Sequence, residues 1–289
     1  MKRSVQLLTA LLAAAATSLH AAGTIANLST YGLVGASAGS LVASIVVEGT
    51  APKNVLVRGV GPGLAAFGVY RPAADVLVEV YDSGGNVVAS NRGYLNAYDS
   101  AALTEISARV GAFPLTNPGD SALTTTLLPG TYWVEVEPFA EDSADGSALL
   151  EVYDTDSPEV RSQIDRLHAR GQIGTVTGAL TAGFVIGGDA AKTILIRGMG
   201  PDLTPPDTAH DAANIASVDL RIYDSKGTLV FFDRGESEDV NEHQITLSPG
   251  AYTVQVTLSL PAIASGEAIV EIFDADPIPS EPLVPTGEF

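Results

Sequence analysis

Apolar and polar positions alternate with a period of two over many short segments of this chain. In one such segment Val76, Val78 and Val80 fall on one side, while Glu79 and Tyr81 fall on the other. A period of two sends successive side chains to opposite faces of a β-strand. Val, Ile, Thr and Tyr, which favour strands, dominate these segments. The pattern therefore predicts short, half-buried strands for most of the chain.

The strand pattern occurs twice. An apolar run, an Arg and a Gly-x-Gly-Pro corner make up Lys53–Leu64, and they return 139 positions later as Lys192–Leu203. Many short strands with regular turns are typical of sandwiches. We predict an all-β protein of two tandem antiparallel β-sandwich modules, jelly-roll-like in type, at residues 24–156 and 162–276. A short linker is expected at Ser157–Gln163.

The turns between strands also repeat. Tyr81-Asp82-Ser83 and Tyr223-Asp224-Ser225 are predicted hairpin turns, in which Asp bonds its own backbone and a following Gly supplies positive φ. From this turn to the next Pro-Gly pair, copy one is 22 residues longer than copy two. This insertion, at about residues 94–126, belongs to the first module alone.

The insertion contains a helical pattern. Leu103, Ile106 and Val110 follow helical spacing, Ser100 is suited to cap the helix, and Gly111 is suited to end it. We predict one short helix here, and no helical pattern lies between the other strands. This excludes a parallel sheet built from β-α-β units.

Trp133 is the only tryptophan of the chain. It shares one face of its strand with Glu135, and the equivalents in copy two are Thr253 and Gln255, as expected of a wet sheet surface. We predict that the helix of the insertion covers Trp133 and Leu77 as a third layer. The alternative is an exposed Trp133 that stacks on a sugar ring as a ligand-binding residue.

The chain of 289 residues is strongly acidic, with a formal net charge of −19. A surface of this sign repels nucleic-acid phosphates and anionic lipid, which excludes both as partners. There is no cysteine, so disulfides and thiolate metal sites are excluded as well.

The two ends of the chain differ from the modules. A basic start, the apolar run Val5–Ala16 and small residues after it predict a signal peptide over residues 1–22. Loss of Lys2 and Arg3 with it takes the net charge from −19 to −21. No other run reaches the roughly 18 apolar residues of a spanning helix, so no transmembrane segment is expected in the mature chain. Residues 277–289 are Pro-rich and are predicted to be extended.

Three patterns suggest chemistry but have simpler explanations. Gly35–Gly39 matches Gly-x-Ser-x-Gly, yet a strand-like run follows it where a nucleophile elbow needs a helix. The Gly59–Pro62 corner lacks the Lys and Ser/Thr of a phosphate-binding loop, so we predict a strand end or bulge. Arg58 and Arg197, which precede the two corners, are predicted to pair with carboxylates.

The mature chain has three histidines, His168, His210 and His243, and none lies near another in sequence. They give no local support to a zinc site or a catalytic triad. A hydrolase site assembled between the modules stays open as an alternative.

Calcium is the cofactor that the sequence favours, although solvated acidic turns explain the same residues. Calcium takes several oxygen ligands from flexible loops, and acidic residues gather in one loop and at the end of each module. The candidate metal ligands are Glu141, Asp142, Asp145, Asp154, Asp156, Asp274 and Asp276.

The Tyr81-Asp82-Ser83-x-Gly85 turn, the Leu-Pro-Gly-x-Tyr motif at 128–132 and the strand Ala148–Tyr153 resemble bacterial pre-peptidase C-terminal (PPC-like) β-sandwich modules. The whole unit, with its Val-Leu-Val-Arg-Gly-Val-Gly-Pro block, is similar to repeats of secreted bacterial proteins of unassigned function. The resemblance implies an ancillary module that binds a substrate or matrix and is sometimes calcium-stabilised.

Together these features predict a secreted, non-enzymatic structural or adhesive protein of the cell surface or extracellular space. Its expected partner is an extracellular polysaccharide or protein. Two alternatives stay open: a subunit that self-assembles by edge-strand or tail-strand pairing, and the extracellular hydrolase.

Overall fold

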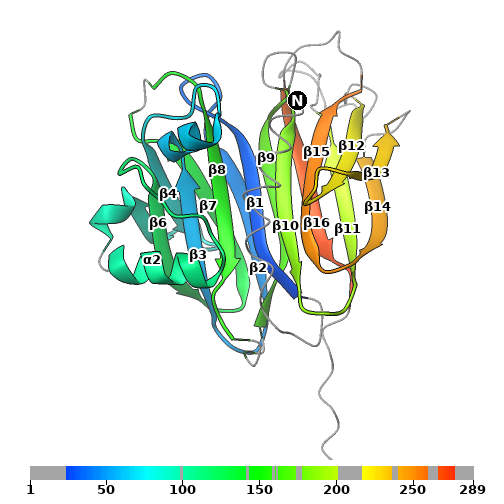
Figure 1. Cartoon of the computed structure of the whole chain (residues 1–289), viewed down its shortest axis with the longest axis horizontal. Coiled ribbons are helices and arrows are strands. Elements are labelled where there is room, and N and C mark those ends of the chain that lie inside the picture. The colour runs from blue at the N-terminus through cyan, green and yellow to red at the C-terminus, as the bar shows by residue number, and fades with distance from the viewer. Residues whose placement is uncertain are drawn as a thin grey trace, which may run out of the picture.

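The computed structural model describes residues 24–97, 100–140, 143–157, 160, 162–173, 178–200, 217–235, 240–259 and 266–276. The predicted signal peptide and the Pro-rich tail lie outside these ranges. Two antiparallel eight-stranded sheets pack face to face (Figure 1). The all-β sandwich prediction is therefore confirmed. Among the described helices, none is long and apolar enough to cross a membrane.

We call the sheet that contains β1 sheet I and the sheet that contains β2 sheet II. Sheet I consists, in spatial order, of β13 (Leu229–Arg234), β12 (Val218–Asp224), β15 (Gly250–Leu258), β10 (Leu180–Gly187), β1 (Thr24–Val34), β8 (Gly146–Asp154), β3 (Lys53–Val60) and β6 (Ser121–Leu127). Sheet II consists of β14 (Val240–Leu247), β11 (Lys192–Met199), β16 (Gly266–Asp274), β9 (Ser162–Ile173), β2 (Leu41–Gly49), β7 (Gly130–Pro138), β4 (Val76–Tyr81) and β5 (Val87–Arg92).

The two copies of the repeat share both sheets. Copy one supplies β1 to β8 and copy two supplies β9 to β16, and each sheet takes four strands from each copy. The copies meet where β1 pairs with β10 and where β2 pairs with β9. Ser162 and Gln163, predicted as linker residues, begin β9 instead. They are ordered because β9 pairs along its length with β2 and β16.

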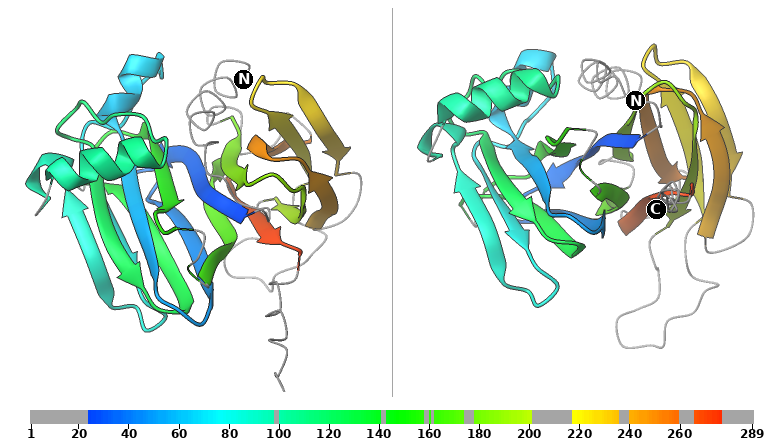
Figure 2. Two further views of the ribbon diagram at one scale, coloured as in Figure 1. Left: turned by 60° about the horizontal axis from the view of Figure 1, so that its bottom comes forward. Right: turned by 90° about the horizontal axis from the view of Figure 1, so that it is seen from below.

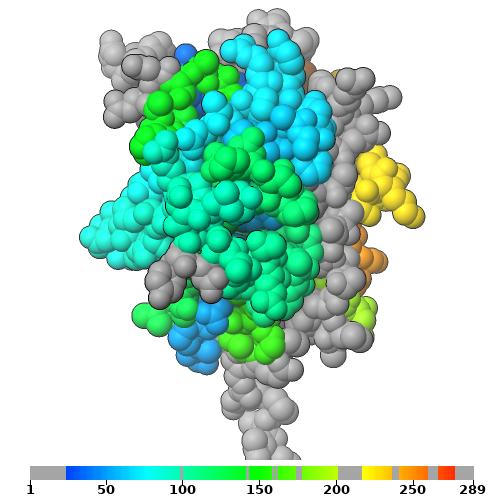
Figure 3. All heavy atoms as spheres, turned by 60° about the vertical axis from the view of Figure 1, so that its left-hand side comes forward, coloured from blue at the N-terminus to red at the C-terminus, as the bar shows by residue number. Residues whose placement is uncertain are grey.

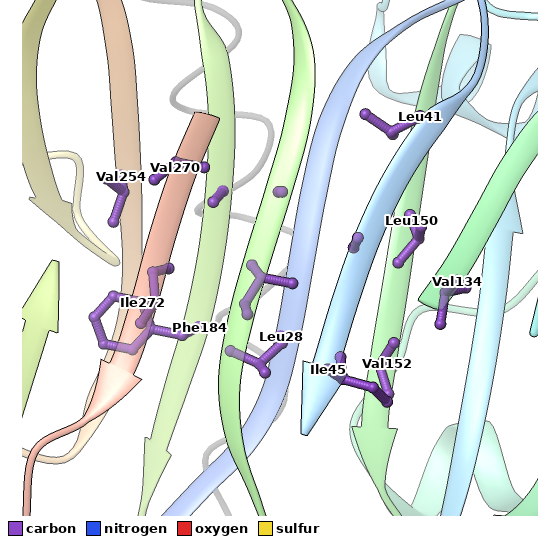
Figure 4. Close-up of a cluster of buried hydrophobic side chains, with 14 of the residues drawn as sticks. Leu28, Leu41, Ile45, Val134, Leu150, Val152, Phe184, Val254, Val270 and Ile272 are labelled. Carbon is purple, nitrogen blue, oxygen red and sulfur yellow. The ribbon is translucent and has the colours of Figure 1, made fainter. Parts of the chain in front are cut away.

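One hydrophobic core runs through both copies. Alternate residues of each strand point into the space between the two sheets. There Leu28 and Phe184 of sheet I form one cluster with Ile45, Val134 and Ile272 of sheet II (Figure 4). All these side chains are fully buried. The continuous core follows from the shared sheets, because burial of apolar area is the main stabilising term and no water-facing boundary separates the copies.

The insertion of copy one forms α2 (Ser100–Arg109) after a 3-10 turn, η3 (Tyr94–Asn96). The helix prediction is confirmed, including its end, where Gly111 has a φ of 74°. The helix lies on the outer face of sheet I, however (Figure 2). There Leu103 packs with Leu56 and Tyr153. A second 3-10 turn, η2 (Pro62–Phe67), covers the same face. In Figure 3 the segments that contain α2 and η2 form one continuous surface.

The prediction that this helix covers Trp133 and Leu77 is therefore wrong. Both residues belong to sheet II, and α2 packs on sheet I. The physical reason is that the insertion connects β5, the last strand of sheet II, to β6 of sheet I. A chain that leaves one sheet and enters the other is able to cover either outer face.

The two hairpin turns form as predicted. Asp82 Oδ1 accepts hydrogen bonds from the backbone N–H groups of Gly84 and Asn86. The hydrogen bond from the Asn86 side chain, and then these backbone bonds, lower the pKa of Asp82. Asp224 Oδ1 accepts the equivalent bonds from Lys226 and Thr228 in copy two.

Candidate functional site

A row of seven side chains crosses the outer face of sheet II. Its members are directly opposite one another on neighbouring strands, and we call them the open row. In spatial order they are Tyr81, Trp133, Ser44, His168, Glu271, Arg197 and Glu242. The first three come from copy one and the other four from copy two, so the row crosses the junction between the copies.

The copy-two half of the open row is an ionic network. His168 Nδ1 lies 2.9 Å from Glu271 Oε1, and Arg197 Nη1 lies 3.6 Å from Glu271 Oε2. Arg197 Nε also donates to Glu242. The hydrogen bond with His168, and then the charges of His168 and Arg197, lower the pKa of Glu271. The pKa of Arg197 is raised, chiefly by its bond to Glu242. The network holds these side chains in fixed positions on the sheet.

The copy-one half presents an aromatic surface beside carboxylates. Trp133 is 38% exposed. The Tyr81 hydroxyl donates to Glu79 Oε2 at 2.5 Å, and Ser40 donates to Glu135. Glu79 and Glu135 lie directly opposite each other. The bond to Glu79 raises the pKa of Tyr81 far above its usual value, so Tyr81 stays a neutral donor.

Sheet I carries the equivalent row, which we call the covered row. In the same spatial order it consists of Tyr223, Thr253, Gly183, Ser29, Glu151, Arg58 and Ala122. Each member is the repeat equivalent of the residue at the same place in the open row. The two rows are thus related by the duplication, with copy one and copy two exchanged.

Apart from Tyr223, which is half-buried, the covered row is closed to solvent. Arg58 Nε lies 3.2 Å from Glu151 Oε2, and the Tyr153 hydroxyl donates to Glu151 Oε1 at 2.7 Å. Arg58 Nη1 donates to the Phe113 carbonyl at 2.9 Å, and its guanidinium lies 4.2 Å from the centre of the Phe113 ring. Phe113 belongs to the insertion, which therefore supplies both a cover and a partner for this ion pair.

Two predictions about these faces have different outcomes. Arg58 and Arg197 each pair with a carboxylate, Glu151 and Glu271, as predicted. Thr253 and Gln255 were expected on a wet surface, but both side chains are buried. Their strand, β15, lies in sheet I, whereas the exposed Trp133 of copy one lies in sheet II, so the repeat equivalence does not carry the same exposure.

Most of the described calcium candidates have other partners. Lys53 Nζ lies 2.8 Å from Asp154 Oδ2 and 3.4 Å from Asp156 Oδ2, and Asp156 also accepts the backbone N–H of Asn54 at 2.9 Å. These contacts fasten the end of β8 beside the start of β3.

Copy two repeats the arrangement. Lys192 Nζ lies 2.7 Å from Asp274 Oδ2 and 3.8 Å from Asp276 Oδ2, and Asp276 accepts the N–H of Thr193. A buried Lys in each copy supplies the positive charge that a cation would bring. Among the described residues, no group of three or more acidic or His side chains is arranged to hold a metal ion.

The remaining calcium candidates lie around residue 145. Asp145 Oδ1 accepts the backbone N–H groups of Ser37 and Ala38 at 2.9 and 3.2 Å. Glu141 and Asp142 lie outside the described residues. Calcium at this loop stays a prediction.

The Gly-rich patterns are structural. Gly35 and Gly39 exchange two backbone hydrogen bonds, and β2 follows. A side chain at Gly35 would put its Cβ 2.6 Å from the Asp145 Cα, and the φ of 149° there also favours glycine. The nucleophile-elbow pattern therefore closes a tight loop.

The corner after β3 binds a carboxylate of the protein itself. Asp120 Oδ1 accepts the N–H groups of Gly61 and Gly63, each at 3.0 Å. Asp120 is fully buried, and burial raises its pKa against the lowering effect of these bonds. The corner thus has an internal anion in place of a phosphate.

The two histidines that the structure describes do not meet. His168 lies on the outer face of β9, while His243 of β14 lies against Phe231 with the ring centres 4.8 Å apart and hydrogen-bonds Asp233 at 2.7 Å. His210 lies outside the described residues. However, Ser44 and His168 are directly opposite each other, with Glu271 next along the open row. Sequence inspection missed this Ser-His-Glu order because the three residues lie on strands that meet only in the fold.

No protein-family model and no curated protein matches the chain. Among solved structures, it is similar to the pre-peptidase C-terminal domain of a collagenase from Bacillus anthracis, with 14% identity over 47% of this chain and 97% of that one, at a TM-score of 0.26. It is also similar to tandem CBM51 modules of a family 98 glycoside hydrolase from Streptococcus pneumoniae, with 8% identity over 80% and 81% of the two chains, at a TM-score of 0.24. Likenesses of this strength carry no argument about function.

Proposed function

We propose that this is an exported, non-enzymatic protein that binds an extended neutral polysaccharide across the open row of sheet II. The observation that carries the proposal is the contrast between two rows of the same origin. The insertion covers one end of the row on sheet I, whereas Trp133, His168 and Arg197 are exposed on sheet II. A face that is left open and carries an aromatic ring is suited to a partner.

The dimensions and chemistry of the open row fit such a ligand. Neighbouring strands lie about 4.8 Å apart, so seven strands give a row roughly 29 Å long. Trp133 offers a flat apolar surface with an N–H donor. Ser44, His168 and Arg197 offer hydrogen-bonding groups along the same line. An extended chain of sugar rings presents this alternation of apolar faces and hydroxyls.

The charges favour a neutral polymer. The Arg and Glu side chains of the open row are already paired with one another. The net charge of −19 opposes the approach of a polyanion. Ion pairs that exist before binding also reduce the entropy lost on binding, because the side chains are already ordered.

The test is binding of the chain without residues 1–22 to an array of immobilised neutral polysaccharides, followed by calorimetry on the best ligand. Trp133→Ala should abolish binding and Trp133→Phe should retain part of it. Tyr70→Ala is the matched control, because Tyr70 is an exposed aromatic residue next to η2, outside the open row. Unchanged binding by Trp133→Ala would exclude this site.

The hydrolase alternative is favoured by one observation, the adjacent order of Ser44, His168 and Glu271 at the junction of the copies. His168 Nδ1 faces Glu271, which is how a carboxylate orients a catalytic base. Against it, Ser44 lies inside β2 between two paired strands, where the ladder uses the backbone N–H groups that an oxyanion hole needs.

A fluorophosphonate probe distinguishes the two functions. A hydrolase would be labelled at Ser44, and labelling would be lost in Ser44→Ala and in His168→Ala. The binding protein should show no labelling at Ser44, and Ser44→Ala should weaken polysaccharide binding without abolishing it, because only one of several hydrogen-bonding groups is lost.

A further inference from the structure

Two strands at the ends of the sheets expose apolar side chains. β5 ends sheet II and β13 ends sheet I, at opposite ends of the molecule. Val87 and Val88 of β5 are 50% and 45% exposed, and Leu229 and Val230 of β13 are 48% and 41% exposed. These two pairs are equivalent in the repeat. The same feature therefore occurs once at each end.

The exposure affects both faces of each strand. Neighbouring residues of a strand point to opposite faces, so a half-buried strand should hide one of each pair. Val76 and Val78 of the adjacent strand β4 are fully buried in this way. At the start of β5 and of β13 neither neighbour is buried, whereas Ala89 and Phe231, one position further along, pack against the core. Each of these end strands therefore begins with an apolar pair that is exposed on both faces.

The other two sheet ends are different. The start of β6 is joined to the end of β5, where Ala122 N–H donates to Asn91 Oδ1 at 3.1 Å and Gly93 N–H donates to Ser121 Oγ at 3.0 Å. Val87 and Val88 lie at the other end of β5. The exposed positions of β6 and β14 include Thr126 and Gln244, which are polar. Polar edges discourage pairing with another chain, whereas an exposed apolar edge favours it.

We propose that a second copy of this chain occupies these edges, with β5 of one molecule pairing with β13 of the next. The chain already uses edge pairing of this kind internally, where β1 joins β10 and β2 joins β9. The side chains also suit each other, because β5 carries the small residues Ala89 and Ser90 where β13 carries the larger Phe231 and Phe232.

When two different surfaces of the same protein pair, the assembly always has one unpaired surface of each kind at its two ends. Further molecules therefore add to it without closing a ring. The structure therefore assigns to the chain an open-ended assembly, in which sheet II of one molecule continues into sheet I of the next. The open row faces away from both edges, so this assembly would array successive binding faces along one fibre. This assembly does not depend on the proposed polysaccharide site.

The test is sedimentation and light scattering of the chain without residues 1–22 over a concentration series. The mass should grow with concentration, and it should grow further with salt, because each molecule carries the same negative charge and salt screens the repulsion. Val88→Lys places a charge on the β5 edge and Val230→Lys places one on the β13 edge, and each charge should prevent pairing at that edge. Each variant alone should therefore remain monomeric. An equimolar mixture should form dimers and nothing larger, because it contains one intact edge of each kind.

Thr126→Lys and Gln244→Lys are matched controls on the other two sheet ends, and both should assemble like the unmodified chain. Circular dichroism and melting curves verify that all four variants fold. A chain truncated after Asp276 should still assemble, which distinguishes β13 from a strand donated by the tail. A monomer at every concentration, dimers of Val88→Lys alone, or loss of assembly on truncation would each overturn the proposal.

Discussion

Arg58 and Arg197 occupy the same position in the two copies of the repeat, yet the Arg58 side chain is fully buried and the Arg197 side chain is 37% exposed. Both pair with the equivalent carboxylate, Glu151 or Glu271. Duplication and insertion together have produced one buried ion pair and one open ion pair from the same sequence motif.

The two arginines should differ in their effect on stability. Arg58→Ala leaves Glu151 buried without its counter-charge, and removal of one partner of a buried pair costs about 3–5 kcal/mol. Arg197→Ala should change the free energy of unfolding much less, because Glu242 is exposed to water and Glu271 keeps His168 as a partner. Urea unfolding of both variants measures the difference, and equal losses would contradict the contrast between the two rows.

Trp133 should report its exposure directly. Its fluorescence should be red-shifted in the folded protein and readily quenched by acrylamide, because it is 38% exposed. Trp133→Ala should cost clearly less than the roughly 3–5 kcal/mol typical of a buried aromatic residue. A blue-shifted emission that acrylamide does not quench would show that the ring is covered.

Asp120 should make the folded protein more stable as the pH falls below neutral. Burial raises its pKa above the unfolded value of 3.8, so the folded state takes up the proton first and the penalty for the buried charge disappears as pH falls through the folded pKa. Asp154 and Asp274 have raised pKa values for the same reason and add to the trend. Asp120→Asn should reduce this pH dependence, measured by urea unfolding between neutral and mildly acid pH.

Asp82→Asn is the control, because the pKa of Asp82 is lowered whereas that of Asp120 is raised. Hydrogen bonds lower the pKa of Asp82, so its stabilising contribution is present above pH 3.8 and is lost only as the pH falls through the lower folded value. Asp82→Asn should leave the slope near neutral pH unchanged. If Asp120→Asn gained more stability toward mildly acid pH than the unmodified chain, the pKa of Asp120 would have to be lowered rather than raised.

Calcium binding at Asp145 should be visible as a higher melting temperature in millimolar calcium than in EDTA, because a ligand of the folded state alone stabilises it. Asp145→Asn should remove the difference, while Asp156→Asn should keep it, since Asp156 already pairs with Lys53. Equal melting temperatures with calcium and with EDTA would exclude this cofactor at the concentrations tested.

The sequence by itself determined the local features. The period of two gave the buried faces of strands such as Val76–Val80, and the spacing from Leu103 to Gly111 gave the helix and its end. The Asp82 turn and the pairing of Arg58 with a carboxylate also followed from short motifs. These properties depend on residues close in sequence or on a charge that must be compensated wherever it is buried.

Tertiary structure alone decided which strands are neighbours and which face is covered. Alternation assigns residues to a face of their own strand, but hydrogen bonding between strands joins segments as distant as Ser44 and His168. It also decided that β7 and β15, equivalent in sequence, belong to different sheets. Trp133 is consequently exposed and Thr253 buried. The open row exists only because the two copies pair edge to edge, and no period within either copy records that contact.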